Sequence, residues 1–140
     1  MSFERIFQEI IQINNNPIEG INVTYNDIKT WVCALKGPNG TLHENLEYII
    51  EMHFPEEYPF RPPLVTFLTP ILHPNVIDDV LHLSILSHDW TPVLTGSKIL
   101  LIIRSILNDP EENFDMNDEA WKLWNTDKDE FKKSLFLTLT

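Results

Sequence analysis

Residues 58–67 read YPFRPPLVTF, and this stretch, together with the segment that follows it, decides the fold. Proline fixes the backbone φ angle and removes a hydrogen-bond donor, so the proline-rich part, taken alone, is compatible with a rigid extended connection. The last four residues, 64–67, have the composition of a short strand. From residue 73 to 94 no regular period is visible, which is typical of a long functional or formerly functional loop.

Outward from this stretch, apolar periodicity predicts an α+β domain. Residues 2–13 carry apolar side chains at helical spacing, and Asn14 to Pro17 stop this helix. Residues 97–107 are apolar on almost every side, as in a helix buried centrally against a sheet. We expect strands at 21–26, 30–36, 46–53 and 64–67, forming a four-stranded antiparallel meander, and two C-terminal helices at 117–124 and 127–137.

Short motifs follow residues 58–67 in a definite order. His73-Pro74-Asn75 comes first, then LHLSIL at 81–86, then WTPVL at 90–94. In this order and at this spacing the region resembles the active-site region of ubiquitin-conjugating enzymes. The resemblance extends from residue 3 to about 135, because the strand opened by Trp31 leads to Gly37-Pro38, residues 54–63 read FPEEYPFRPP, and Asp109-Pro110 closes the apolar helix. It implies the ubiquitin-conjugating-enzyme fold, with residues 1–140 as a single domain.

The nucleophile of that family is missing at its usual place. The family carries its thioester cysteine in an isoleucine-cysteine-leucine-aspartate run, whereas residues 81–84 here read Leu-His-Leu-Ser. Ubiquitin transfer needs an easily ionised nucleophile that forms an energy-rich acyl intermediate, which a cysteine thiolate provides. The resemblance therefore implies an inactive homologue with a degenerate catalytic site made of His73, Pro74, Asn75, His82 and Ser84.

Other interpretations of these residues stay open. Imidazole can form a short-lived acyl intermediate, and Ser84 faces the same way as His82 if the run is extended, so the two could pair. No orienting acid or nucleophile-elbow motif is expected with that pair. A metal site from His73, His82 and His88 would lack a carboxylate or cysteine ligand at suitable spacing. We expect no metal and no cofactor.

The turn before His82 also departs from the family. One residue fewer lies between Asn75 and Leu81, and the family's glycine is missing, so Asp79 or Val80 must meet the backbone demand that glycine eases. In the family the histidine of His-Pro-Asn holds the loop, and the asparagine amide is thought to stabilise the oxyanion. Without a thioester partner, Asn75 is expected only to shape the loop.

The resemblance also implies a partner surface. In the family, the phenylalanine of the tyrosine-proline-phenylalanine loop and a proline-alanine pair form the ligase-binding patch. Here Phe60, Pro92 and Val93 keep that apolar shape and suit a protein partner; the alternative is that Phe60 packs into the core. The family's first helix docks the activating enzyme with basic residues, whereas this helix offers Arg5 against Glu4 and Glu9, which disfavours that docking.

Composition excludes other classes of function. A formal net charge of −11 argues against nucleic acid, which needs grouped basic residues. No apolar run approaches the ~20 residues of a membrane span. Cys33 is the only cysteine, which excludes an intrachain disulfide or a cysteine zinc cluster, and it is expected in the core. The N-terminus lacks a signal pattern, so a cytoplasmic or nuclear location is expected.

The sequence thus predicts a non-catalytic ubiquitin-conjugating-enzyme variant that acts as a binding or regulatory subunit. Its protein partner would be ubiquitin, a catalytic conjugating enzyme or a ligase. The alternative is an active ubiquitin or ubiquitin-like transferase, or an enzyme with repurposed chemistry at His82.

Overall fold

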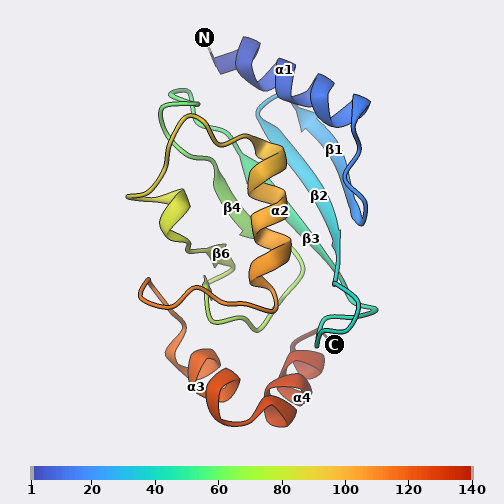
Figure 1. The fold of residues 1–140 in the computed structure, drawn as a ribbon, viewed down its shortest axis with the longest axis vertical. Coiled ribbons are helices and arrows are strands. Elements are labelled where there is room, and N and C mark those ends of the chain that lie inside the picture. The colour runs from blue at the N-terminus through green and yellow to red at the C-terminus, as the bar shows by residue number, and fades with distance from the viewer. Residues whose placement is uncertain (1, 140) are drawn as a thin grey trace.

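Helices cover one face and both ends of an antiparallel sheet in this α+β fold (Figure 1). The structure is a computed structural model that describes residues 2–139. Its elements are α1 (Ser2–Asn15), β1 (Ile21–Asp27), β2 (Thr30–Lys36), β3 (Glu47–His53), β4 (Leu64–Phe67), β5 (Val76–Ile77), β6 (Val80–Leu81), the 3-10 helix η1 (Ser84–Leu86), α2 (Gly96–Ile106), α3 (Asp118–Thr126) and α4 (Lys128–Leu139). Within residues 2–139, none of the helices has the length and apolarity needed to cross a bilayer.

The four long strands form the predicted antiparallel meander. Each pairs with the next along the chain, and the register places Ile21 opposite Leu35 and Lys36 opposite Glu47. The short β5–β6 hairpin extends the sheet beyond β4, so the strand order is β1-β2-β3-β4-β6-β5. These two-residue strands were not predicted, because two residues are too few to show an alternating pattern.

The β5–β6 turn shows how the chain manages without glycine. Asp78 and Asp79 have φ angles of 51° and 68°, both in the left-handed region. Two-residue hairpin turns of type I′ need positive φ at both central positions, and aspartate tolerates this better than most residues. The expectation for Asp79 is therefore confirmed and extends to Asp78, whereas that for Val80 is wrong, because Val80 lies within β6.

Relieving this turn should stabilise the protein. The double change Asp78→Asn with Asp79→Gly supplies the residues that type I′ turns prefer, and we expect a gain of about 0.5–1 kcal/mol in the free energy of unfolding. Urea denaturation would measure it, with exposed Glu112→Gln as a control for the loss of negative charge. An unchanged or lower midpoint in the double variant would contradict this account of the turn.

Helix α2 packs its apolar face against the sheet. Ile99, Leu100 and Ile103 are fully buried in the core that also holds Trp31. The helix begins at Gly96, where an added Cβ would lie only 2.3 Å from the Trp31 ring, so glycine permits this close approach. The prediction of a central apolar helix is confirmed for this inner face. The outer face is different, since Leu101 is 48% exposed.

The two C-terminal helices form a separate small cluster at the end of the molecule opposite α1 (Figure 1). The Asn117 side chain caps α3 by accepting a hydrogen bond from the backbone of Ala120. Trp124 and Phe131 pack ring edge against ring face across the α3–α4 turn, with centroids 5.2 Å apart.

Candidate functional site

The residues predicted to form a degenerate catalytic site lie where the β5–β6 hairpin, η1 and residues 107–117 meet. The backbone N–H of His82 donates to the carbonyl of Asn75 at 2.7 Å, which ties the two ends of the hairpin together. The carbonyl of Pro74 accepts a hydrogen bond from the backbone of Asn117 at the start of α3, also at 2.7 Å. The structure therefore brings the predicted residues into one region, although their side chains do not all face one another.

His73 is a buried structural residue. Its Nε2 donates to the carbonyl of Ile106 at 2.6 Å, and its Nδ1 accepts from the backbone N–H of Asn75 at 3.0 Å. These partners suit the neutral ring protonated at Nε2. Burial lowers the pKa of His73 to about 4, although the Ile106 carbonyl opposes the shift. The ring thereby fastens the loop to the end of α2.

Asn75 forms a reciprocal pair with the backbone of Glu111. Its Nδ2 donates to the Glu111 carbonyl at 2.9 Å, and its Oδ1 accepts from the Glu111 N–H at 2.8 Å. The residue has no solvent exposure. With both ends of the amide engaged and buried, Asn75 shapes the loop rather than presenting a donor to solvent.

The Glu111 carboxylate holds Ser84, a contact that the sequence did not reveal. It accepts from the Ser84 N–H at 2.7 Å and from the Ser84 hydroxyl at 2.6 Å. Within the described residues no hydrogen bond joins Ser84 to His82, so the hydroxyl proton points to Glu111. The only sequence signal was a carboxylate just after Asp109-Pro110, with no spacing rule linking it to Ser84.

His82 stands at the edge of a shallow, largely apolar cavity of about 220 Å³. Its side chain is 33% exposed, and its Nδ1 lies 3.6 Å from a carboxylate oxygen of Asp115. Leu64, Leu86 and Phe114 contribute to the cavity lining. The expectation that no acid accompanies Ser84 and His82 is therefore wrong. The two acids nevertheless serve different residues, so they make two separate pairs rather than one serine–histidine–acid relay.

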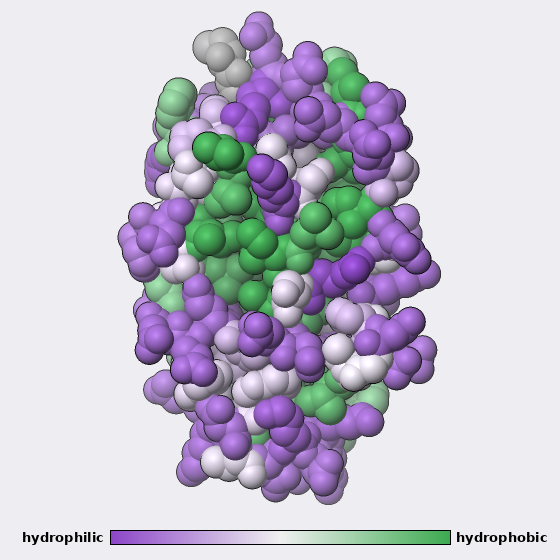
Figure 2. All heavy atoms as spheres, viewed as in Figure 1, coloured by the Kyte–Doolittle hydropathy of each residue, from purple (hydrophilic) through white to green (hydrophobic). Residues whose placement is uncertain are grey.

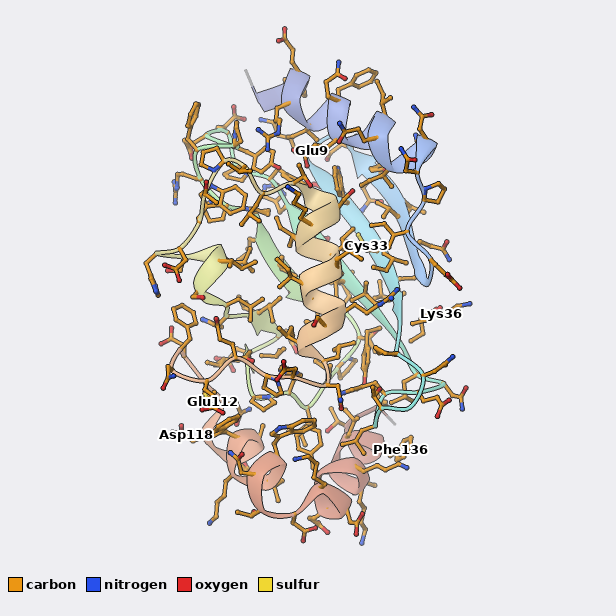
Figure 3. The ribbon with its side chains drawn as sticks, in the orientation of Figure 1. Glu9, Cys33, Lys36, Glu112, Asp118 and Phe136 are labelled. Atoms are coloured by element: carbon orange, nitrogen blue, oxygen red, sulfur yellow. The ribbon has the colours of Figure 1, made fainter. Side chains whose placement is uncertain are left out.

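Cys33 lies deep in the sheet. It is fully buried in β2, opposite Ile50 of β3, and belongs to the same core as the buried residues of α2; Figure 3 labels it beside that helix. Burial raises the pKa of its thiol to about 12. Because the thiolate is the reactive form, Cys33 is a poor nucleophile at neutral pH.

The three histidines named as a metal alternative have separate partners. His73 bonds to backbone groups, His82 faces Asp115, and exposed His88 lies 3.6 Å from a carboxylate oxygen of Asp89. Across the described part of the chain, no three histidine, cysteine, aspartate or glutamate side chains are placed to hold a metal ion.

Phe60, Pro92 and Val93 are on the surface, and we refer to them as the apolar patch. Phe60 is 78% exposed and Val93 is 69% exposed, so the alternative in which Phe60 packs into the core is wrong. The indole N–H of Trp90 donates to the carbonyl of Pro59 at 2.9 Å, which joins the two segments that carry the patch. Figure 2 shows further apolar side chains gathered over α2, the helix that carries the exposed Leu101.

Acidic residues without basic neighbours in the sequence occupy two segments of the chain. The three lysine or arginine pairs with carboxylates found among the described residues are Arg5–Glu9, Lys29–Glu56 and Arg61–Glu57, on α1 and the segments near Phe60. By contrast, residues 62–97 and 105–121 contain no lysine or arginine. Figure 3 places Glu112 and Asp118 at the end of the molecule opposite α1. The acidic residues of those two segments are Asp78, Asp79, Asp89, Asp109, Glu111, Glu112, Asp115, Asp118 and Glu119.

Glu9 is not on the surface of α1, so the expectation that it would repel an activating enzyme from this helix is wrong. Glu9 is only 3% exposed, and the Arg5 guanidinium donates a hydrogen bond to its carboxylate at 2.8 Å. The electrostatic argument against an activating enzyme on α1 therefore rests on Glu4 and on the commitment of Arg5 to internal contacts.

One comparison with known proteins bears on identity. A family model described as ubiquitin-conjugating enzyme matches residues 5–138, from the first turns of α1 to the end of α4. This match, the α+β fold and the His-Pro-Asn loop agree, and the chain belongs to the ubiquitin-conjugating enzyme family.

Proposed function

We propose that this protein is a non-catalytic member of its family and acts as a binding or regulatory subunit in ubiquitin or ubiquitin-like conjugation. The observation that carries the proposal is the position of the only thiol. Cys33 is fully buried within the sheet, while the loop position that should bear the nucleophile holds the imidazole of His82. No side chain in the loop offers the ionisable thiol that an energy-rich thioester requires.

The neighbouring groups support the same proposal. The Asn75 amide is buried and bonded to Glu111, and the Ser84 hydroxyl is bonded to the carboxylate of the same residue. These two polar groups therefore have structural partners that would have to be given up before either group could act on a substrate.

Contacts would then carry the function, and the apolar patch is the surface best suited to them. An exposed aromatic ring beside proline and valine, with nearby charges paired within the chain, fits an apolar pocket on another protein. We propose ubiquitin, a catalytic conjugating enzyme or a ligase as the partner, met in the cytoplasm or nucleus.

A charging assay tests the loss of catalysis. Incubation with activating enzyme, ubiquitin and ATP should give no reductant-sensitive adduct on a non-reducing gel, because Cys33 is buried and protonated. His82→Cys should restore little or no conjugation, since the turn, Ser84 and the first helix also differ from the family. A reductant-labile band lost in Cys33→Ser would contradict the proposal. Robust chain synthesis by His82→Cys would mean that the loop is still organised for catalysis and that the loss of activity rests on one side chain.

The contact between His82 and Asp115 favours a second candidate, an enzyme that uses His82. A carboxylate near Nδ1 can help to orient an imidazole for nucleophilic or general-base chemistry, and His82 is accessible at the edge of the apolar cavity. In the same charging assay this candidate requires faster discharge of the ubiquitin thioester of the activating enzyme, whether or not an adduct accumulates, and this discharge must be lost in His82→Ala. Its absence would leave the binding role.

Phe60→Ala tests the surface. Removing a central aromatic anchor typically costs ~2 kcal/mol or more of binding, roughly a thirtyfold loss of affinity. Capture from native lysate followed by mass spectrometry would identify the partner, and titration calorimetry would measure its affinity for each variant. Leu68→Ala, which also truncates an exposed apolar side chain, is the matched control. Equal affinity of the wild type and Phe60→Ala would exclude the apolar patch.

A further inference from the structure

Arg5 joins α1 to the segment that carries Pro92 and Val93. Its Nη2 donates to the carbonyl of Pro92 at 2.7 Å and to the carbonyl of Leu94 at 3.1 Å. Its Nε donates to the carboxylate of Glu9 at 2.8 Å. One guanidinium therefore binds the backbone carbonyls on both sides of Val93, and its contact with Glu9, one turn further along α1, fixes its orientation.

The same guanidinium is linked to the segment that carries Phe60. It lies 5.6 Å from the centre of the Tyr58 ring, and the Tyr58 hydroxyl donates to Glu9 at 2.5 Å. Phe60 follows Tyr58 by two residues, and its own N–H bonds to the carbonyl of Glu57. Both halves of the apolar patch are thus attached to neighbouring residues on one face of α1.

We propose that Arg5 is a positioning residue for the apolar patch: it holds residues 92–94 in the conformation that a protein partner recognises. The inference rests on the proposed binding function, but it concerns a residue whose side chain is mostly covered and is used for internal contacts. The first helix would then set the geometry of the partner surface instead of docking an activating enzyme.

Arginine suits this task better than lysine. A planar guanidinium can donate to Glu9 through Nε and to two carbonyls through Nη2 at the same time. A lysine ammonium is a single point of charge on a flexible stem, so it can keep one of these contacts but not the whole set. Arg5→Lys should therefore rescue only part of what Arg5→Gln removes.

Hydrogen exchange followed by mass spectrometry tests the positioning role without any partner. The amides of Val93 and Leu94 bond to Thr91 within the segment, so their exchange reports on its conformation. We expect exchange at residues 93–95 to be about tenfold faster in Arg5→Gln than in the wild type, with Arg5→Lys at an intermediate rate. Exchange at residues 99–103 of α2 should increase much less than at residues 93–95, because those amides depend on Arg5 only through overall stability. Glu4→Gln, an exposed change on the same helix, should behave as the wild type.

Two results would overturn the inference. Unchanged exchange at residues 93–95 would mean that Arg5 does not hold the segment. Equally faster exchange in α2 would mean that Arg5 only supports global stability. Both can be read whether or not a partner is captured, so failure of the inference is distinguishable from failure of the proposed function.

Where a partner is captured, a double-mutant cycle separates positioning from direct contact. If Arg5 acts through the segment, Arg5→Gln should weaken binding about tenfold in the wild-type background and far less in Val93→Ala. Independent, additive losses would assign Arg5 a direct contact with the partner and would contradict the positioning role.

Discussion

Glu9→Ala is expected to lower the free energy of unfolding by about 3–5 kcal/mol, the usual cost of breaking a buried, fully bonded charge pair. Glu9 accepts from Arg5, from the Tyr58 hydroxyl at 2.5 Å and from the N–H of Gly96 at 2.5 Å. Burial raises the pKa of Tyr58, and the Glu9 carboxylate adds to this, so the phenol keeps its proton and donates. The Gly96 N–H is the first donor of α2, where a carboxylate is also favoured by the helix dipole.

Urea denaturation at neutral pH would measure this loss. Tyr58→Phe removes one of the three contacts and should cost only about 1 kcal/mol. Glu4→Ala, at an exposed position on the same helix, should stay within about 0.5 kcal/mol of the wild type. A loss below 1 kcal/mol in Glu9→Ala would show that solvent reaches these donors and that the network contributes little.

Acid should destabilise the protein through His73. The folded pKa of about 4 lies below the ordinary value of 6.5, so the native state keeps the ring neutral while the unfolded chain takes up a proton. Stability from this group is therefore fully present above pH 6.5 and is lost as the pH falls toward 4. The loss between pH 7 and pH 5 should be about 2 kcal/mol. Burial also lowers the pKa of His43, which acts in the same direction.

Denaturation at several pH values would test this, in about 0.3 M salt so that the relief of self-repulsion in an acidic chain is screened. His73→Asn should show a smaller fall in stability between pH 7 and pH 5. If that variant does not fold, nitrogen chemical shifts of the wild-type ring at pH 5 give the answer. A protonated His73 in the native protein at pH 5 would contradict the prediction.

The sequence predicted the long elements well, for a physical reason. Apolar residues at regular spacing show which face of an element is buried, so α1, the four long strands and α2 could be located from their own residues. Short elements and contacts between distant residues produce no such periodic pattern in the sequence. The β5–β6 hairpin depends on two aspartates that accept positive φ, and the partner of Ser84 lies 27 residues away in an irregular segment.

The roles of charged residues were the hardest to foresee. Glu9 sits in an amphipathic helix where a carboxylate normally faces water, and only the three-dimensional structure brings Arg5, Tyr58 and Gly96 around it. Phe60 could be placed on the surface only through the resemblance to the family, since composition alone favours a buried aromatic residue. The family model locates the domain but does not say which of its surfaces this chain uses.

The burial of Cys33 has a practical consequence. Because the only thiol is enclosed and protonated, a cysteine introduced at the surface can be labelled without first replacing Cys33. A fluorophore or spin label attached through Val93→Cys or Leu101→Cys would report on one surface position at a time, with little background from the native chain. Which label responds when a partner is added would map the side of the molecule that it approaches.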